Sequence, residues 1–122
     1  MRNTPKFTRT QPHLNLMAML SDLGFQQEEE RGFGQYAVDS YVPRLHAAFE
    51  ADGPQHSQSS DKKRDAYLMA KYALPVFRMS AKDLSGTREE QLIVLARFLL
   101  RHLLEDSALA RKSFARSSGW ED

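Results

Sequence analysis

Residues 45–51 limit most strongly what this chain can fold into. They are mainly apolar, as in a strand at the centre of a sheet, yet Glu50 lies within them and Asp52 follows directly. Side chains of a strand alternate between its two faces, so these two carboxylates share one face. Acidic side chains seldom occupy a central strand. Their presence here indicates that this strand contributes functional residues as well as core residues.

Apolar residues that recur every three or four positions predict three helices. The first ends at Gly24, the second ends before Pro75, and a capping-box pattern from Thr87 to Glu90 opens the third. We expect these helices over 12–23, over 61–73 and from the capping box to at least residue 105.

Alternating or apolar runs between the helices predict four strands. A glycine-containing turn at 32–34 joins the first two, and Pro43-Arg44 makes the turn before the third. The predicted order, α-β-β-β-α-β-α, defines an α/β fold with a mixed sheet of about four strands flanked by helices. We expect the strands at 25–31, 36–41, 45–51 and 76–79.

The length of 122 residues and the hydrophobic share of 41% are enough for one modest core. We expect one domain over 12–106, preceded by a basic arm at 1–11 and followed by a polar tail at 107–122. The chain shows no apolar run long enough to span a membrane and no secretory leader, so we expect a cytoplasmic protein. Because cysteine is absent, any metal would take oxygen or imidazole ligands.

The net charge of +1 conceals a segregation of charge along the chain. Residues 28–52 carry six acids and two bases, whereas residues 61–85 carry six bases and three acids. Arg9 adds to the basic part from the N-terminal arm. A basic surface beside an acidic centre suits a phosphodiester substrate, and scattered solvated charge is the alternative interpretation.

The residues that carry chemistry are concentrated in the second and third predicted strands and the loop after them. Asp39 faces Glu50 and Asp52 across the hairpin, which predicts a magnesium site, because Mg²⁺ takes oxygen ligands and commonly uses only one or two protein carboxylates. His56 follows in the loop, where it could protonate a leaving oxygen or orient an attacking water. Taken alone, an acid on a strand or a histidine in a loop is usually a solvated surface group.

Together these segments form one pattern, which resembles the very-short-patch-repair-like endonuclease domains of the PD-(D/E)XK nuclease group, including homing endonucleases with an E-D-x-H-D signature. The resemblance covers about residues 12–85 and implies a restriction-endonuclease-like fold in a bacterial or phage protein. The matching segments are Tyr36-Ala-Val-Asp39-Ser-Tyr, Phe49-Glu50-Ala-Asp52-Gly53-Pro-Gln-His56, Asp61-Lys-Lys-Arg64-Asp65 with Leu68, and Pro75-Val-Phe-Arg78.

By this resemblance the protein is a DNA endonuclease that depends on Mg²⁺, with Mn²⁺ able to substitute. Asp39 would be the principal metal ligand, Glu50 and Asp52 would occupy or neighbour the (D/E)-x-K positions, and His56 would be the acid or base. Arg64 would assist catalysis by positioning phosphate or by holding the acidic cluster. The expected nucleic-acid contacts are Lys62, Lys63, Arg64, Arg78 and Arg9.

A salt bridge to a nearby carboxylate is the alternative interpretation of both Arg64 and Arg78. Two departures from the family pattern favour a second function, a catalytically inactive module that binds nucleic acid or a partner. The motif lysine is replaced by an acid in Glu50-Ala51-Asp52, and the first helix carries Asn15 where many relatives have glutamate. A metal-dependent phosphatase is a third possibility, which would predict a closed pocket.

The long third helix carries more apolar residues than one narrow stripe can hold. They can all be buried in one core, or part of them can form a second surface. In the second case we expect a homodimer or docking to a larger partner protein.

Overall fold

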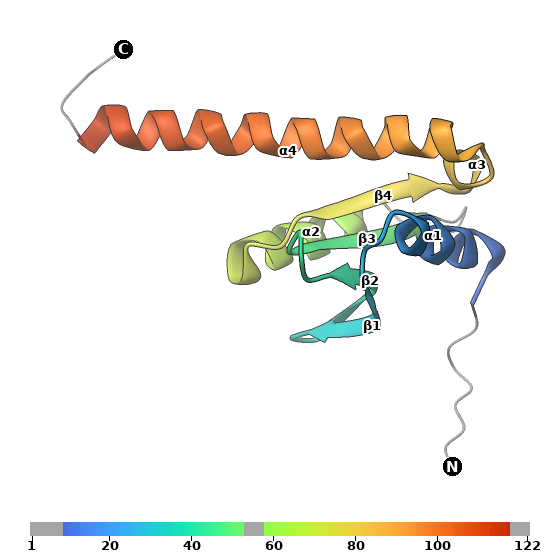
Figure 1. The fold of residues 1–122 in the computed structure, drawn as a ribbon. Helices are drawn as coiled ribbons and strands as arrows, with labels where there is room; N and C mark the ends of the chain where they lie inside the picture. Colours follow the sequence, from blue (N-terminus) through green and yellow to red (C-terminus); the bar gives the residue numbers. More distant parts are fainter. Residues whose placement is uncertain (1–8, 53–57, 118–122) are drawn as a thin grey trace.

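The computed structural model describes residues 9–52 and 58–117, which form one sheet and the helices around it (Figure 1). The four strands lie in the order β1-β2-β3-β4. Pairing is antiparallel from β1 to β3, whereas β3 and β4 are parallel, so the sheet is mixed. The strands are β1 (Glu28–Phe33), β2 (Tyr36–Val42), β3 (Ala47–Asp52) and β4 (Val76–Ser80).

Helices flank this sheet in the predicted order. Parallel strands need a long crossover, which here contains α2. The predicted α/β fold and the order α-β-β-β-α-β-α are confirmed, with one short additional helix after β4. The helices are α1 (Gln11–Asp22), α2 (Gln58–Tyr72), α3 (Ala81–Leu84) and α4 (Arg88–Ser117).

The boundaries differ from the predicted ones where turns interrupt the patterns. The first strand begins at Glu28 instead of residue 25, because Phe25 still closes α1 by donating its amide to the Leu20 carbonyl. The third begins at Ala47 instead of residue 45, since His46 has φ 48° and closes the turn by donating to the Pro43 carbonyl. The turn between β1 and β2 lies at 34–35, not at 32–34, and Gly34 there has φ 65°.

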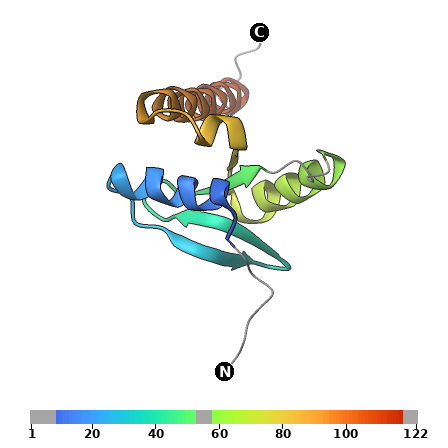
Figure 2. The same cartoon turned by 90° about the vertical axis from the view of Figure 1, so that its right-hand side faces the viewer.

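Helices lie on both sides of the sheet (Figure 2), and two apolar clusters occupy its two faces. On one face, α1, α3 and α4 pack on alternate residues of β3 and β4, centred on Phe49, whose ring lies 5.3 Å from that of Phe77. On the other face, Leu68 of α2 packs against Ala48 and the hairpin of β1 and β2. Both faces of β3 are therefore covered by helices, as predicted for a central strand.

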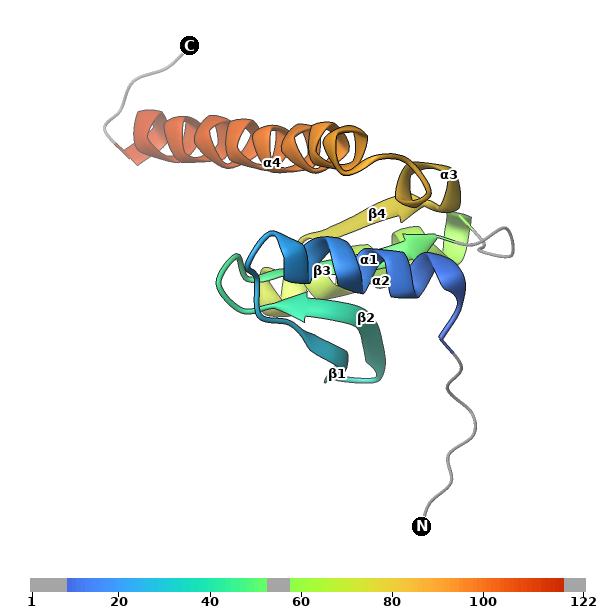
Figure 3. The ribbon, with the colours of Figure 1, turned by 45° about the vertical axis from the view of Figure 1, so that its right-hand side comes forward.

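Helix α4 has two apolar faces, of which one is used by the core. Leu95 is buried there, whereas a stripe on the opposite side is exposed. The helix runs along the sheet and extends beyond its edge (Figures 1 and 3). It also continues past the boundary predicted at residue 106, to Ser117. The exposed α4 stripe consists of Leu92, Ile93, Leu100, Leu103 and Leu104. In the described part of the chain, no helix is long and apolar enough to cross a membrane.

Candidate functional site

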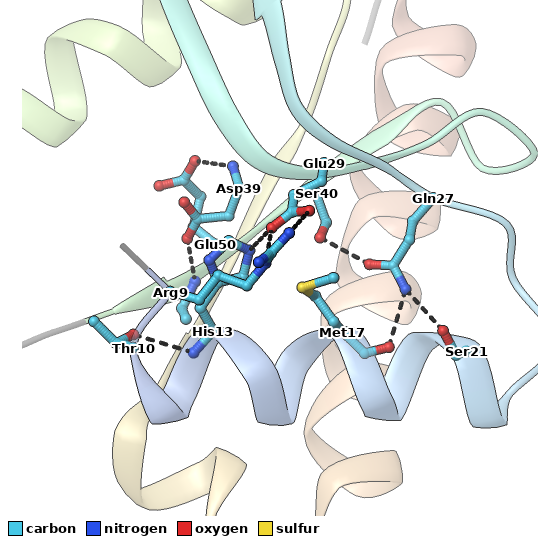
Figure 4. A network of polar contacts seen from close by, with 11 residues as sticks. Arg9, Thr10, His13, Met17, Ser21, Gln27, Glu29, Asp39, Ser40 and Glu50 are labelled. Carbon is cyan, nitrogen blue, oxygen red and sulfur yellow. Dashed lines mark hydrogen bonds and ion pairs between the residues drawn. The ribbon is translucent and has the colours of Figure 1, made fainter. Parts of the chain in front are cut away.

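Two carboxylates lie where the regular pairing of β2 and β3 ends. The register of these strands runs from Val42 opposite Ala47 to Ser40 opposite Phe49. Beyond it, the Asp39 amide donates to Glu50 Oε2 at 3.1 Å, and the Ala51 amide donates to Asp39 Oδ2 at 3.0 Å. The two side chains thus accept from backbone amides of the facing strand and lie next to each other (Figure 4). We call Asp39 and Glu50 the carboxylate pair.

The strands are irregular around this pair. Val38 and Tyr41 belong to the same apolar cluster although they are three residues apart, so the alternation of β2 is broken between them, next to Asp39. In β1, Glu30 has φ 53°, and its position opposite Asp39 is skipped by the regular pairing, which includes Glu29 with Ser40 and Arg31 with Val38 on either side. Such a backbone costs a residue other than glycine about 1–3 kcal/mol. The surrounding structure therefore holds Glu30 in place against this cost.

Glu50 is the buried member of the pair, with a side chain only 4% exposed. Burial raises the pKa of its carboxyl group, and the negative charge of Asp39 raises this pKa further. Arg64 acts in the opposite direction, because its Nη2 lies 2.9 Å from Glu50 Oε1 and favours the ionised form. Burial and Asp39 therefore disfavour the ionised form of Glu50, whereas Arg64 stabilises it.

A network of ion pairs between arginine and aspartate side chains connects the carboxylate pair to α2. Arg78 of β4 binds both carboxylate oxygens of Asp65, with Nη2 at 3.0 Å from Oδ1, and its Nε lies 3.5 Å from Asp61 Oδ2. Arg64 lies 3.9 Å from each of the same two aspartates. Arg64 and Asp65 each lie about one helical turn after Asp61. This ion-pair network fastens α2 to β3 and β4.

The salt-bridge interpretation of Arg64 and Arg78 is thus realised, and contact of either side chain with phosphate stays a prediction. Arg9 is engaged as well, since its guanidinium binds Glu29 through two hydrogen bonds of 2.5 and 2.8 Å. Lys62 and Lys63 are exposed on α2. Of the expected nucleic-acid contacts, these two lysines and Arg9 are exposed at the surface.

The structure brings Asp39 and Glu50 together but does not add Asp52 to them. Within residues 9–52 and 58–117, no three histidine, aspartate or glutamate side chains are grouped so that they could hold a metal ion. Positions two apart on a strand are separated by about 6.6 Å, which leaves the half-buried Asp52 one step further along β3. A metal-binding role of Asp52 stays a prediction, and His56 lies outside the described residues.

Two residues beside the pair were not predicted from the sequence. The pKa of the Glu30 carboxyl group is raised, mainly because this group is partly buried and also because the negative charge of Asp39 lies nearby. The place of Glu30 opposite Asp39 follows from the hairpin register, which could have revealed it. His13 is buried at the start of α1, with Nε2 3.8 Å from Glu29 Oε2. No pattern in the sequence singled it out.

A second polar contact holds α1 against β2 next to the pair. The buried Ser40 donates its hydroxyl to Gln27 Oε1 at 2.8 Å, and Gln27 Nε2 donates to the Met17 carbonyl at 2.9 Å (Figure 4). Gln27 therefore links the strand that carries Asp39 to the helix beneath it. The position of Asp39 is fixed from this side as well as from β3.

The chain matches no protein-family model and no curated protein sequence. Its fold is similar to that of a solved structure described as "Homing Endonuclease I-Bth0305I Catalytic Domain". The TM-score is 0.60 at 19% sequence identity, and the match covers 76% of this chain and 97% of that chain. At this identity the likeness establishes a shared fold, and the nuclease activity belongs to the neighbour.

Proposed function

We propose that this chain is a metal-dependent endonuclease that hydrolyses phosphodiester bonds in DNA, of the very-short-patch-repair-like kind within the PD-(D/E)XK group. One observation carries the proposal. The carboxylate pair lies where two central strands part, in a fold shared with the catalytic domain of a homing endonuclease. A DNA substrate also agrees with the cytoplasmic location expected from the sequence.

The carboxylate pair fits a Mg²⁺ ion in its donor chemistry. Both residues offer hard oxygen ligands, and Mg²⁺ commonly takes only one or two carboxylates, with water and phosphate as further ligands. Three of the four oxygens accept hydrogen bonds, whereas Asp39 Oδ1 receives none from the described residues. Asp39 and Glu50 would hold the ion, and Mn²⁺ would replace it. When bound, such an ion polarises a phosphoryl oxygen and makes its bound water more acidic.

The remaining residues would bind and orient the substrate. Lys62 and Lys63 lie exposed on the helix that borders the pair, where they would attract the phosphate backbone. The ion-pair network holds this helix against β3 and β4. His56 stays our candidate for the acid or base that moves the proton.

Supercoiled plasmid tests this proposal directly. We expect the purified protein to convert it to nicked or linear DNA in Mg²⁺ or Mn²⁺ and to leave it intact in EDTA. Gel electrophoresis over a time course measures the conversion. If the DNA is retarded but not cut in either metal, the chain is the inactive binding module instead, which the replaced motif lysine favours.

We also propose that the exposed α4 stripe binds a second copy of this chain. The side chains of Leu100 and Leu104 are 58% and 62% exposed, and together with Arg97 and Glu105 they line one shallow hollow of about 410 Å³. An antiparallel copy brings Arg97 of each chain near Glu105 of the other, while Arg101, which also lines the hollow, lies near its own copy.

Replacing Leu100 by glutamate is expected to convert this dimer into a monomer, because two unpaired glutamates, one from each chain, would then lie in an apolar contact. Light scattering over a range of concentrations measures the mass. Leu14→Glu is the matched control, since Leu14 is 43% exposed on α1, away from the stripe. A monomeric unsubstituted protein at high concentration contradicts the dimer and leaves a larger partner protein as the occupant.

A further inference from the structure

The contact between Arg64 and Glu50 occupies part of the carboxylate pair. Arg64 Nη2 donates to Glu50 Oε1 at 2.9 Å, and the backbone amide of Asp39 donates to Oε2. Both oxygens of Glu50 are therefore engaged. A cation that bridges Asp39 and Glu50 has to share Glu50 with a guanidinium that is already there.

The guanidinium has other carboxylates within reach. Arg64 Nη2 lies 3.9 Å from Asp61 Oδ1, and Arg64 Nε lies 3.9 Å from Asp65 Oδ1. Its side chain is 16% exposed, so part of the guanidinium borders the solvent. A small rotation would replace the contact with Glu50 by one with Asp61, and the positive charge would stay paired throughout.

We infer that Arg64 is an internal counterion, which neutralises Glu50 before metal binds and which a divalent cation must displace from that carboxylate. This inference rests on the proposed function, since it concerns the ion that the carboxylate pair would hold. A guanidinium and a divalent cation at one carboxylate repel each other, and the buried setting leaves little water to screen them. Arg64 would thus lower the affinity of the empty protein for metal.

The size of the effect follows from what a neighbouring charge does to a carboxyl group. A unit charge within about 4–6 Å changes proton affinity roughly 10-fold to 1000-fold. The loss of the Arg64 charge should therefore strengthen metal binding at least about tenfold. Arg64→Gln is the variant of choice, because its amide can still donate to Glu50 while the charge is gone.

Binding of Mn²⁺ without nucleic acid tests the inference. Titration calorimetry at pH 8, with electron paramagnetic resonance to count free Mn²⁺, gives the affinity of the unsubstituted protein, Arg64→Gln and Arg64→Met. Lys71→Gln is the matched control, because it removes one positive charge from an exposed position of the same helix. We expect tighter binding in both Arg64 variants and unchanged binding in Lys71→Gln.

The outcomes separate this inference from the proposed function. Mn²⁺ binding that Asp39→Asn abolishes, with no gain in either Arg64 variant, overturns the counterion while the metal site stands. If Mn²⁺ affinity rises equally in the Arg64 and Lys71 variants, the rise comes from the lower net charge alone, and the counterion inference is overturned as well. If no protein of the series binds Mn²⁺, both the counterion and the metal site fail. Circular dichroism confirms folding, and Arg64→Gln decides if Arg64→Met unfolds.

Discussion

Asp39→Asn is expected to lower metal-dependent cleavage of plasmid DNA at least about 100-fold, since a metal ion contributes several kcal/mol to such hydrolysis. The asparagine keeps the shape of the side chain and can still accept from the Ala51 amide. It removes the negative charge that would hold the ion. Initial rates of nicking in Mg²⁺ and Mn²⁺ measure the effect.

Asp22→Asn is the control for the Asp39 variant. Asp22 pairs with Arg88 at the surface, and its side chain is 60% exposed. The Asp22→Asn substitution makes the same chemical change away from the carboxylate pair. The cleavage rate of this variant should therefore match that of the unsubstituted protein. If Asp39→Asn folds normally and keeps full activity, Asp39 is not a metal ligand, and Glu50 has no partner carboxylate in the proposed site.

Phe49→Ala is expected to destabilise the protein by about 3–5 kcal/mol. Phe49 is fully buried between the helices and Phe77, and the smaller side chain leaves a cavity that the sheet cannot close. A domain of this kind is stable by about 5–15 kcal/mol, so the loss is a large share of the total. Unfolding in urea, followed by circular dichroism, measures the free energy.

The conservative variant Phe49→Leu separates packing from other causes. It keeps an apolar side chain of intermediate size, and we expect a loss clearly smaller than that of Phe49→Ala. The urea slope should stay unchanged in both, because each exposes the same surface on unfolding. A loss below about 1 kcal/mol for Phe49→Ala would mean that the apolar cluster around Phe49 contributes little to the stability of the protein.

The order of elements followed from the sequence because periodicity is a local property. Apolar spacing placed the sheet and its helices, and Gly24 and Pro75 ended two of them as predicted. The errors lie where tertiary contacts decide. The start of β3 depends on a left-handed His46, whose Nδ1 lies 2.8 Å from the Tyr41 hydroxyl and whose Nε2 lies 2.9 Å from the Tyr72 carbonyl. No local pattern encodes such a contact.

The site was predictable in part for the same reason. A period of two brought Asp39 opposite Glu50, and that pair is present. The same period extended the expectation to Asp52, which lies further along β3 and whose metal-binding role stays a prediction. The pairing of Arg64 with Glu50 spans the crossover between β3 and α2, where no short-range rule fixes which carboxylate a guanidinium meets.

The outer edge of β1 borders no other strand in the described chain. An open edge offers free backbone groups to any extended segment and so invites aggregation. Here four successive charged residues, Glu28 to Arg31, line the edge, and the left-handed backbone of Glu30 interrupts its regular course. Glu30 would thus also hinder a neighbouring molecule from extending the sheet, and a neutral, regular strand in its place would make aggregation easier.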